Sequence, residues 1–117
     1  MNEPDQGSVV LVDLGYSDQV QSKLRPALII SNSEINRISR DVIVMKITSK
    51  EPRFRKVRIT REDLLTGTLA YESYVQIDAI HTVEKTIIRE IIGVLNKGKL
   101  QEIKNHIPFL FALDSSG

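Results

Sequence analysis

Two segments, RPALIISN at Arg25–Asn32 and DVIVMKIT at Asp41–Thr48, decide the fold of this 117-residue chain. Both are rich in apolar and β-branched residues, which favour buried β-strands. The sequence between them, Ser33–Ile38, is long enough for one helical turn, with Ser31 or Asn32 as its N-cap. We therefore expect two buried strands joined by a short helix.

Further strands flank this pair on both sides. Upstream, SVVLVDL at Ser8–Leu14 predicts a buried strand, and Tyr16–Leu24 predicts a loop of about ten residues, longer than most connections in small domains. Downstream we expect a strand that alternates apolar and basic residues, a short turn region, two short strands that bend near Asp78, and a last strand: Phe54–Thr60, Glu62–Gly67, Tyr74–Thr82 and Thr86–Leu95.

The end of the chain has a different period. Apolar residues recur there at three- and four-residue spacing, which is typical of an amphipathic helix: Leu100, Ile103, Ile107, Leu110 and Phe111. We expect a helix over residues 97–105 with Asn96 as its cap, then a kink or a second short helix begun by Pro108. The fold class is mainly β with a C-terminal helix, as a small, strongly bent antiparallel sheet or barrel. One domain over residues 1–117 is expected, with disorder-prone ends at 1–6 and 114–117.

Composition excludes several classes of function. Apolar residues make up 41% and charged residues 26%, as in a globular fold. The chain has no cysteine and only two histidines, so a disulfide framework, a zinc–thiolate site or a histidine-rich metal centre is not expected. No apolar run reaches the roughly 18–20 residues of a membrane span, and the first residues lack the pattern of a signal peptide. We expect a cytoplasmic protein without a cofactor or a membrane partner.

Positive charge is concentrated in one segment. Residues 37–61 hold nine lysines and arginines against two acidic residues, whereas the whole chain has a net charge of +1. A local excess of seven positive charges suits an anionic partner that binds one part of the surface. The alternative is a solvated pair of strands with long basic side chains.

Polar residues at the predicted strand ends are the candidates for chemistry. The chain has neither a Gly-x-Ser-x-Gly motif nor a glycine-rich phosphate loop. Arg25 stands where the long loop enters a strand, Thr48 and Ser49 stand where the third strand ends, and Asp78 lies among apolar neighbours. A guanidinium and two hydroxyls at one sheet rim could bind a phosphate and stabilise charge on phosphorus. Alternatively, Arg25 pairs with a carboxylate and Thr48 merely ends a strand.

Several stretches resemble the MazF/PemK (Kid) toxins of bacterial toxin–antitoxin pairs. The matching stretches, in family order, are GSVVLVDL (residues 7–14), RPALIISN (25–32), VIVMKITSK (42–50), SYVQIDAIHTVEK (73–85) and IIGVL (91–95). The resemblance implies a small SH3-like antiparallel barrel with a C-terminal helix, assembled as a homodimer. It also implies metal-independent cleavage of single-stranded RNA at short sequences, in which the 2′-hydroxyl attacks the adjacent phosphate and leaves a 2′,3′-cyclic phosphate.

The resemblance assigns catalytic roles to Arg25, Thr48 and Asp78. The RNA-binding candidates are Gln21, Ser49, Arg53, Phe54, Arg55, Lys56, Arg58, Gln76 and His81. Phe54 and Tyr16 are either stacking residues for unpaired bases or part of the core or its rim. The chain departs from the family at the glutamate before Gln21, at the glycine before Arg25 and at the basic positions now held by Gln76 and His81. His81 is either an acid or base at the site or a surface residue.

The implied partners are a single-stranded mRNA and a small MazE-like antitoxin with an acidic tail. Two other functions stay open at this point. One is a catalytically silent MazF-like relative that binds RNA or a protein. The other is a gyrase-inhibiting toxin of the CcdB type; those toxins act through a C-terminal Trp-Gly-Ile, whereas this chain has no tryptophan.

Overall fold

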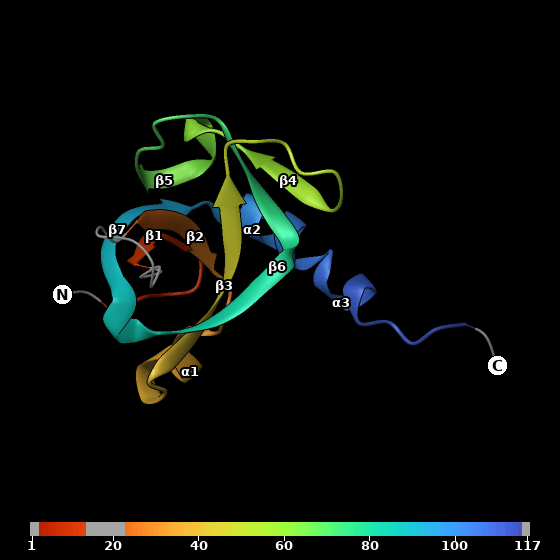
Figure 1. The fold of residues 1–117 in the computed structure, drawn as a ribbon, viewed down its shortest axis with the longest axis horizontal. Coiled ribbons are helices and arrows are strands. Elements are labelled where there is room, and N and C mark those ends of the chain that lie inside the picture. The colour runs from red at the N-terminus through yellow and green to blue at the C-terminus, as the bar shows by residue number, and fades with distance from the viewer. Residues whose placement is uncertain (1–2, 14–22, 116–117) are drawn as a thin grey trace.

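One curled antiparallel sheet forms the body of the molecule (Figure 1). The computed structural model describes residues 3–13 and 23–115. Their strands are β1 (Ser8–Asp13), β2 (Leu24–Ile29), β3 (Asp41–Thr48), β4 (Lys56–Ile59), β5 (Leu64–Gly67), β6 (Ser73–Glu84) and β7 (Ile88–Leu95). They follow the order β4-β6-β3-β2-β1-β7-β5, so β4 and β5 are the edges.

The sheet curls because two long strands that are consecutive in the chain pair at different places in it. β6 pairs with β3, whereas β7 pairs with β1, and the short 3-10 helix η2 (Lys85–Ile87) joins the two. Figure 1 shows β6 and β7 as a continuous band around β1, β2 and β3. The predicted bent sheet with a C-terminal helix is confirmed.

Each face of the sheet has its own apolar core, because side chains alternate between the faces of a strand. On one face, Leu28 and Met45 pack with Ile103 of the C-terminal helix. On the other, Ala27, Ile29 and Val44 pack inside the curl. The second core matters for function, because the same face continues into polar residues at the ends of β2 and β3.

Helices cover the ends of the sheet. α1 (Ser33–Ile38) is capped by Asn32, whose side chain accepts from the Glu34 amide at 2.8 Å. α2 (Lys97–Lys104) is capped by Asn96, which accepts from the Lys99 amide at 2.7 Å. α3 (Ile107–Leu110) follows with proline in its first turn and projects from the body (Figure 1). Both predicted caps are confirmed; the last helix begins one residue before Pro108.

Several predicted boundaries change. The region of Glu62–Gly67, predicted as a turn, holds the 3-10 helix η1 (Arg61–Asp63) and the edge strand β5. The predicted pair of strands near Asp78 is one strand, β6, with an irregular register there. β4 starts only at Lys56, and β2 ends at Ile29. The predicted loop over residues 16–24 lies outside the described residues except for its last two, of which Leu24 already belongs to β2.

A buried asparagine ties the first described residues to α1. Asn36 is 1% exposed, and its amide nitrogen donates to the carbonyl oxygens of Pro4 and Ser31 at 2.8 and 3.1 Å. The Gln6 side chain donates to the Ile30 carbonyl at 2.8 Å. Pro4 and Gln6, which the sequence placed in a disorder-prone end, are thus held against the fold. None of the helices within residues 3–13 and 23–115 is long and apolar enough to cross a membrane.

Candidate active site

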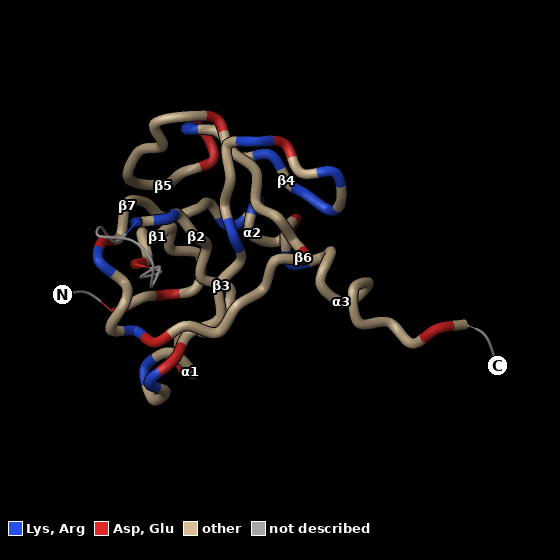
Figure 2. Tube along the Cα trace, in the orientation of Figure 1, with Lys and Arg blue, Asp and Glu red and all other residues tan. Residues whose placement is uncertain are grey.

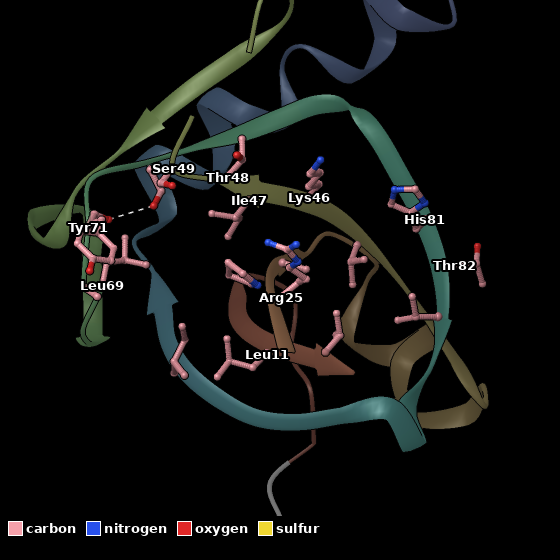
Figure 3. Close-up of a pocket in the computed structure, with 18 residues that line it drawn as sticks. Leu11, Arg25, Lys46, Ile47, Thr48, Ser49, Leu69, Tyr71, His81 and Thr82 are labelled. Carbon is pink, nitrogen blue, oxygen red and sulfur yellow. Dashed lines mark hydrogen bonds between the residues drawn. The ribbon is translucent and has the colours of Figure 1, made fainter. Parts of the chain in front are cut away.

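A pocket of about 800 Å³ opens where β2 begins and β3 ends (Figure 3). Apolar side chains such as Leu11, Ile47 and Leu69 form part of its wall. Its polar lining residues are Arg25, Lys46, Thr48, Ser49, Tyr71, Ser73, His81 and Thr82. No aspartate or glutamate of the described residues lines it. A cavity with basic groups and hydroxyls but without carboxylates in its lining is suited to an anionic ligand.

Strand register brings Arg25 and Thr48 to the same face of the sheet. Ala27 of β2 pairs with Lys46 of β3. Because the two strands are antiparallel, the same register places Arg25, two residues before Ala27, opposite Thr48, two residues after Lys46. Residues opposite each other in an antiparallel pair point to the same face. Both therefore continue the face that Ala27 and Val44 bury inside the curl. Arg25 and Thr48 therefore line the same pocket (Figure 3).

The two groups are available to a ligand. The Arg25 residue is exposed, and its side chain forms no ion pair or hydrogen bond within the part of the chain that the structure describes. The alternative in which it pairs with a carboxylate finds no support there. The Thr48 hydroxyl oxygen accepts from the Lys50 amide at 3.2 Å. That bond orients the hydroxyl and leaves its O–H free to donate to a phosphate oxygen.

Lys46 and His81 extend the basic lining along the same face. Lys46 is two residues from Thr48, so the alternation of the strand directs both side chains to one side. His81 lies on β6 and pairs with Val44 of β3, whose side chain points to the same side. The pocket thus gathers a guanidinium, an ammonium and an imidazole from three neighbouring strands (Figure 3).

Tyr71 supplies an aromatic ring at the pocket, from the connection between β5 and β6. Its side chain is 74% exposed. This connection begins at Gly67, whose φ of 87° lies in the left-handed region that favours glycine. A Cβ there would lie 2.0 Å from the Ile92 carbonyl oxygen. Gly67 therefore permits the close approach of β5 to β7, and Tyr71 lies in the connection that follows.

The structure does not bring every predicted site residue to this pocket. Ser49 and His81 line it, but Asp78 is exposed on the irregular part of β6 and is not a lining residue. Gln76 is half-buried opposite Lys56 on the β4 side of the sheet. Gln21 and the other loop residues between 14 and 22 lie outside the described residues.

Most of the predicted basic strand is engaged by partners within the molecule. Arg55 lies over the Phe109 ring, 4.0 Å from its centroid, and Lys56 pairs with Glu51 at 2.7 Å. The bidentate contact from Arg58 lowers the pKa of the Glu72 carboxyl through hydrogen bonding, and the same contact raises the pKa of Arg58. Arg53 and Phe54 are exposed but do not line the pocket. Figure 2 shows the basic residues of 53–58 along β4 and the loop before it. None of these residues lines the pocket.

Metal-ligating side chains do not cluster in the described part of the chain. Within residues 3–13 and 23–115, no three histidine, cysteine, aspartate or glutamate side chains gather closely enough to hold a metal ion.

Comparison with known proteins identifies the family. A family model described as PemK-like, MazF-like toxin of type II toxin–antitoxin system matches residues 5–111. The chain belongs to this toxin family. Among its MazF relatives, Endoribonuclease MazF4 of Mycobacterium tuberculosis strain H37Rv is 31% identical over 104 residues, which are 88% of each chain. Endoribonuclease MazF of Staphylococcus saprophyticus is 30% identical over 112 residues, 92% of this chain and 91% of that one.

Solved structures of MazF relatives share the fold. A mycobacterial endoribonuclease in complex with its cognate antitoxin is 29% identical, with a TM-score of 0.73 over 99% of this chain and 100% of that chain. The family resemblance drawn from the sequence motifs is therefore confirmed.

Four polar residues of this pocket were not among the candidates from the sequence: Lys46, Tyr71, Ser73 and Thr82. Lys46 was counted only as one of the basic residues of segment 37–61. Its spacing of two from Thr48 on a predicted strand was the signal that could have found it. Tyr71 had no such signal, because its position depends on the close approach of β5 to β7.

Proposed function

We propose that the chain is an endoribonuclease toxin that cleaves single-stranded mRNA in the cytoplasm at the pocket of Arg25 and Thr48. The observation that carries the proposal is the geometry of these two residues. A guanidinium without an internal partner in the described residues and a hydroxyl with a free proton line one pocket without carboxylates in its lining. The endoribonuclease names of the MazF relatives support the same function.

The proposed reaction needs no metal. The RNA 2′-hydroxyl loses its proton and attacks the adjacent phosphorus, and the bond to the 5′-oxygen breaks. The products are a 2′,3′-cyclic phosphate and a 5′-hydroxyl, which takes up a proton. Negative charge builds on the phosphate oxygens during the attack, and the Arg25 guanidinium stabilises it. The Thr48 hydroxyl donates a hydrogen bond to one of these oxygens.

His81 is placed for one of the two proton transfers. An imidazole can give or take a proton near neutral pH, and His81 lines the pocket. Asp78, to which the resemblance assigns the base, is not in the lining, so its role stays a prediction. Cleavage by His81→Ala and Asp78→Asn decides between them: the variant of the residue that moves the proton is expected to lose about a hundredfold or more in rate.

The proposed RNA path runs from the pocket towards β4. Ser49 and Tyr71 contact the nucleotide at the pocket, and exposed Arg53 and Phe54 lie on the basic segment beside it. Lys56 and Arg58 lie on β4, Gln76 pairs with Lys56, and Arg55 immediately precedes β4. These side chains contribute charge or hydrogen bonds to the RNA backbone there. Gln21 in the preceding loop completes the predicted RNA-binding set.

The proposed assemblies are a homodimer and a complex with an antitoxin. The mycobacterial relative was solved with its cognate antitoxin, which supports a MazE-like partner for this chain. A basic pocket and basic segment attract an acidic tail, which would occupy the site of the RNA phosphates. Large apolar side chains at the projecting end of the chain, Phe109, Phe111 and Leu113, offer a surface that a dimer would bury.

Cleavage of a long transcript in the presence of EDTA tests the function. The purified chain is expected to cut the RNA and leave ends that mass spectrometry identifies as 2′,3′-cyclic phosphates. Arg25→Ala and Thr48→Val should each lower the rate at least about a hundredfold, because each removes a donor to the developing charge. Arg37→Ala, on the exposed side of α1, is the control and should cut at the normal rate. Full activity in purified Arg25→Ala would refute this site.

A further inference from the structure

We propose that Lys46 binds a backbone phosphate of the RNA beside the phosphate held by Arg25 and Thr48. The proposal rests on the proposed function, because it takes RNA as the ligand of this pocket. It adds a substrate-contacting residue to which neither the family resemblance nor the roles proposed above assign a function.

The position of Lys46 on β3 directs it into the pocket. Its cross-strand neighbour on β2 is Ala27, which has the smallest side chain of the second core. The small neighbour leaves room for the apolar stem of a lysine to cross the wall while the ammonium reaches open space. Thr48 is the next residue on the same face, roughly 7 Å further along the strand. The ammonium and the Arg25–Thr48 pair therefore face the same cavity (Figure 3).

The other side of Lys46 offers no residue in direct register. Along β3, Met45 pairs with Ile80 and Ile47 pairs with Val75, so Lys46 alone faces four residues of β6. Because of this bulge, no side chain of β6 stands directly opposite Lys46. The bulge also carries Asp78, the nearest candidate for a counter-ion in the sequence of β6.

Lys46 nevertheless has no counter-ion among the described residues. None of their carboxylates, Asp78 included, comes within 4.0 Å of its ammonium, and none of them lines the pocket. By contrast, Lys56, Lys85 and Lys99 each pair with a glutamate. The guanidinium and the ammonium in one cavity repel each other, and an anionic ligand relieves that repulsion. A lysine ammonium is suited to a single phosphate oxygen as a point charge.

The salt dependence of RNA binding tests this role separately from cleavage. The probe is a pool of short single-stranded 2′-O-methyl RNAs of randomised sequence, which cannot form the cyclic phosphate. Binding is measured by fluorescence anisotropy over a range of salt for the native chain, Lys46→Met, Lys46→Arg and Lys97→Met. Lys97, exposed at the start of α2 and outside the pocket, is the matched control, because its substitution removes the same charge.

Loss of one phosphate contact lowers the slope of log affinity against log salt by about 0.7 for a single strand. Lys46→Met is expected to show that decrease and a several-fold loss of affinity, while Lys46→Arg restores both and Lys97→Met changes neither. Equal slopes for Lys46→Met and Lys97→Met would overturn the proposal even if the native chain cleaves RNA. A native chain that binds the probe with the predicted Lys46 dependence but cuts no RNA would instead overturn the endoribonuclease function alone. Absence of binding by the native chain would overturn both.

Discussion

Tyr71 is the residue for which the structure makes the sharpest prediction about RNA affinity. Its ring is exposed at the pocket, where an unpaired base can stack on it. Stacking of a base on an aromatic side chain contributes about 1–3 kcal/mol. Tyr71→Ala should therefore weaken binding of non-cleavable RNA by roughly tenfold to a hundredfold, and Tyr71→Phe should bind normally.

The comparison variant is Phe54→Ala. Phe54 is 72% exposed but lies outside the pocket, so its removal should cost less affinity than that of Tyr71. A larger loss from Phe54→Ala would move the base-binding surface to the loop before β4.

The residues of the site differ in how far the sequence could predict them. Arg25 and Thr48 were predictable. Arg25 lies near the start of one strand and Thr48 at the end of the next, and both strands have a clear apolar pattern. The separation of Asp78 from the pocket was not predictable. It results from a bulge in which β6 has three more residues than β3 between two paired positions. A bulge of this kind leaves little trace in the periodicity of a single strand.

At the scale of elements, the edge strand β5 depends on Gly67. Gly67→Ala places a Cβ 2.0 Å from the Ile92 carbonyl oxygen and 2.4 Å from the Gly93 Cα, at a φ that alanine rarely adopts. We expect a loss of about 1–3 kcal/mol in the free energy of unfolding, measured by urea denaturation. RNA binding should weaken too, because Tyr71 follows β5.

Gly98→Ala is the matched control within the same chain. Gly98 lies in the first turn of α2, and a Cβ there would meet only the Asn96 side-chain oxygen at 3.5 Å. Alanine favours a helix over glycine by about 0.8–1 kcal/mol, so this variant should be slightly more stable than the native chain. Equal stability of the two alanine variants would contradict the close packing of β5 on β7.

The elements that the sequence predicted best are those with a long apolar pattern. β3 has the predicted bounds, Asn96 is the predicted cap of α2, and Asn32 is one of the two residues predicted to cap α1. β5 was missed because it is four residues long and buries none of them fully, so its pattern is that of a turn. Its pairing with β7 depends on contacts between distant segments, which local propensity cannot report.

For the whole molecule, the projecting C-terminal end predicts the oligomeric state. Phe111 and Leu113 are 70% and 95% exposed, which costs hydration free energy in a monomer. If the homodimer buries this end, Phe111→Asp should shift the mass measured by light scattering from two chains towards one. Ile38→Asp, at a position that is 88% exposed on α1, is the control and should leave the mass unchanged. A dimeric Phe111→Asp would place the dimer contact elsewhere on the surface.

The strand order has a consequence for the time at which the chain becomes harmful during its own synthesis. The first strand is central in the sheet, between β2 and β7, and β5 has only β7 as its neighbour. A nascent polypeptide that has not yet emerged from the ribosome as far as Leu95 lacks a complete β7. The first strand then misses one of its two neighbours, and β5 misses its only one. The wall around Tyr71 and Ile92 cannot close until then. A product terminated before Leu95 would be inert, and a newly made molecule would acquire its destructive capacity only after β7 has been synthesised.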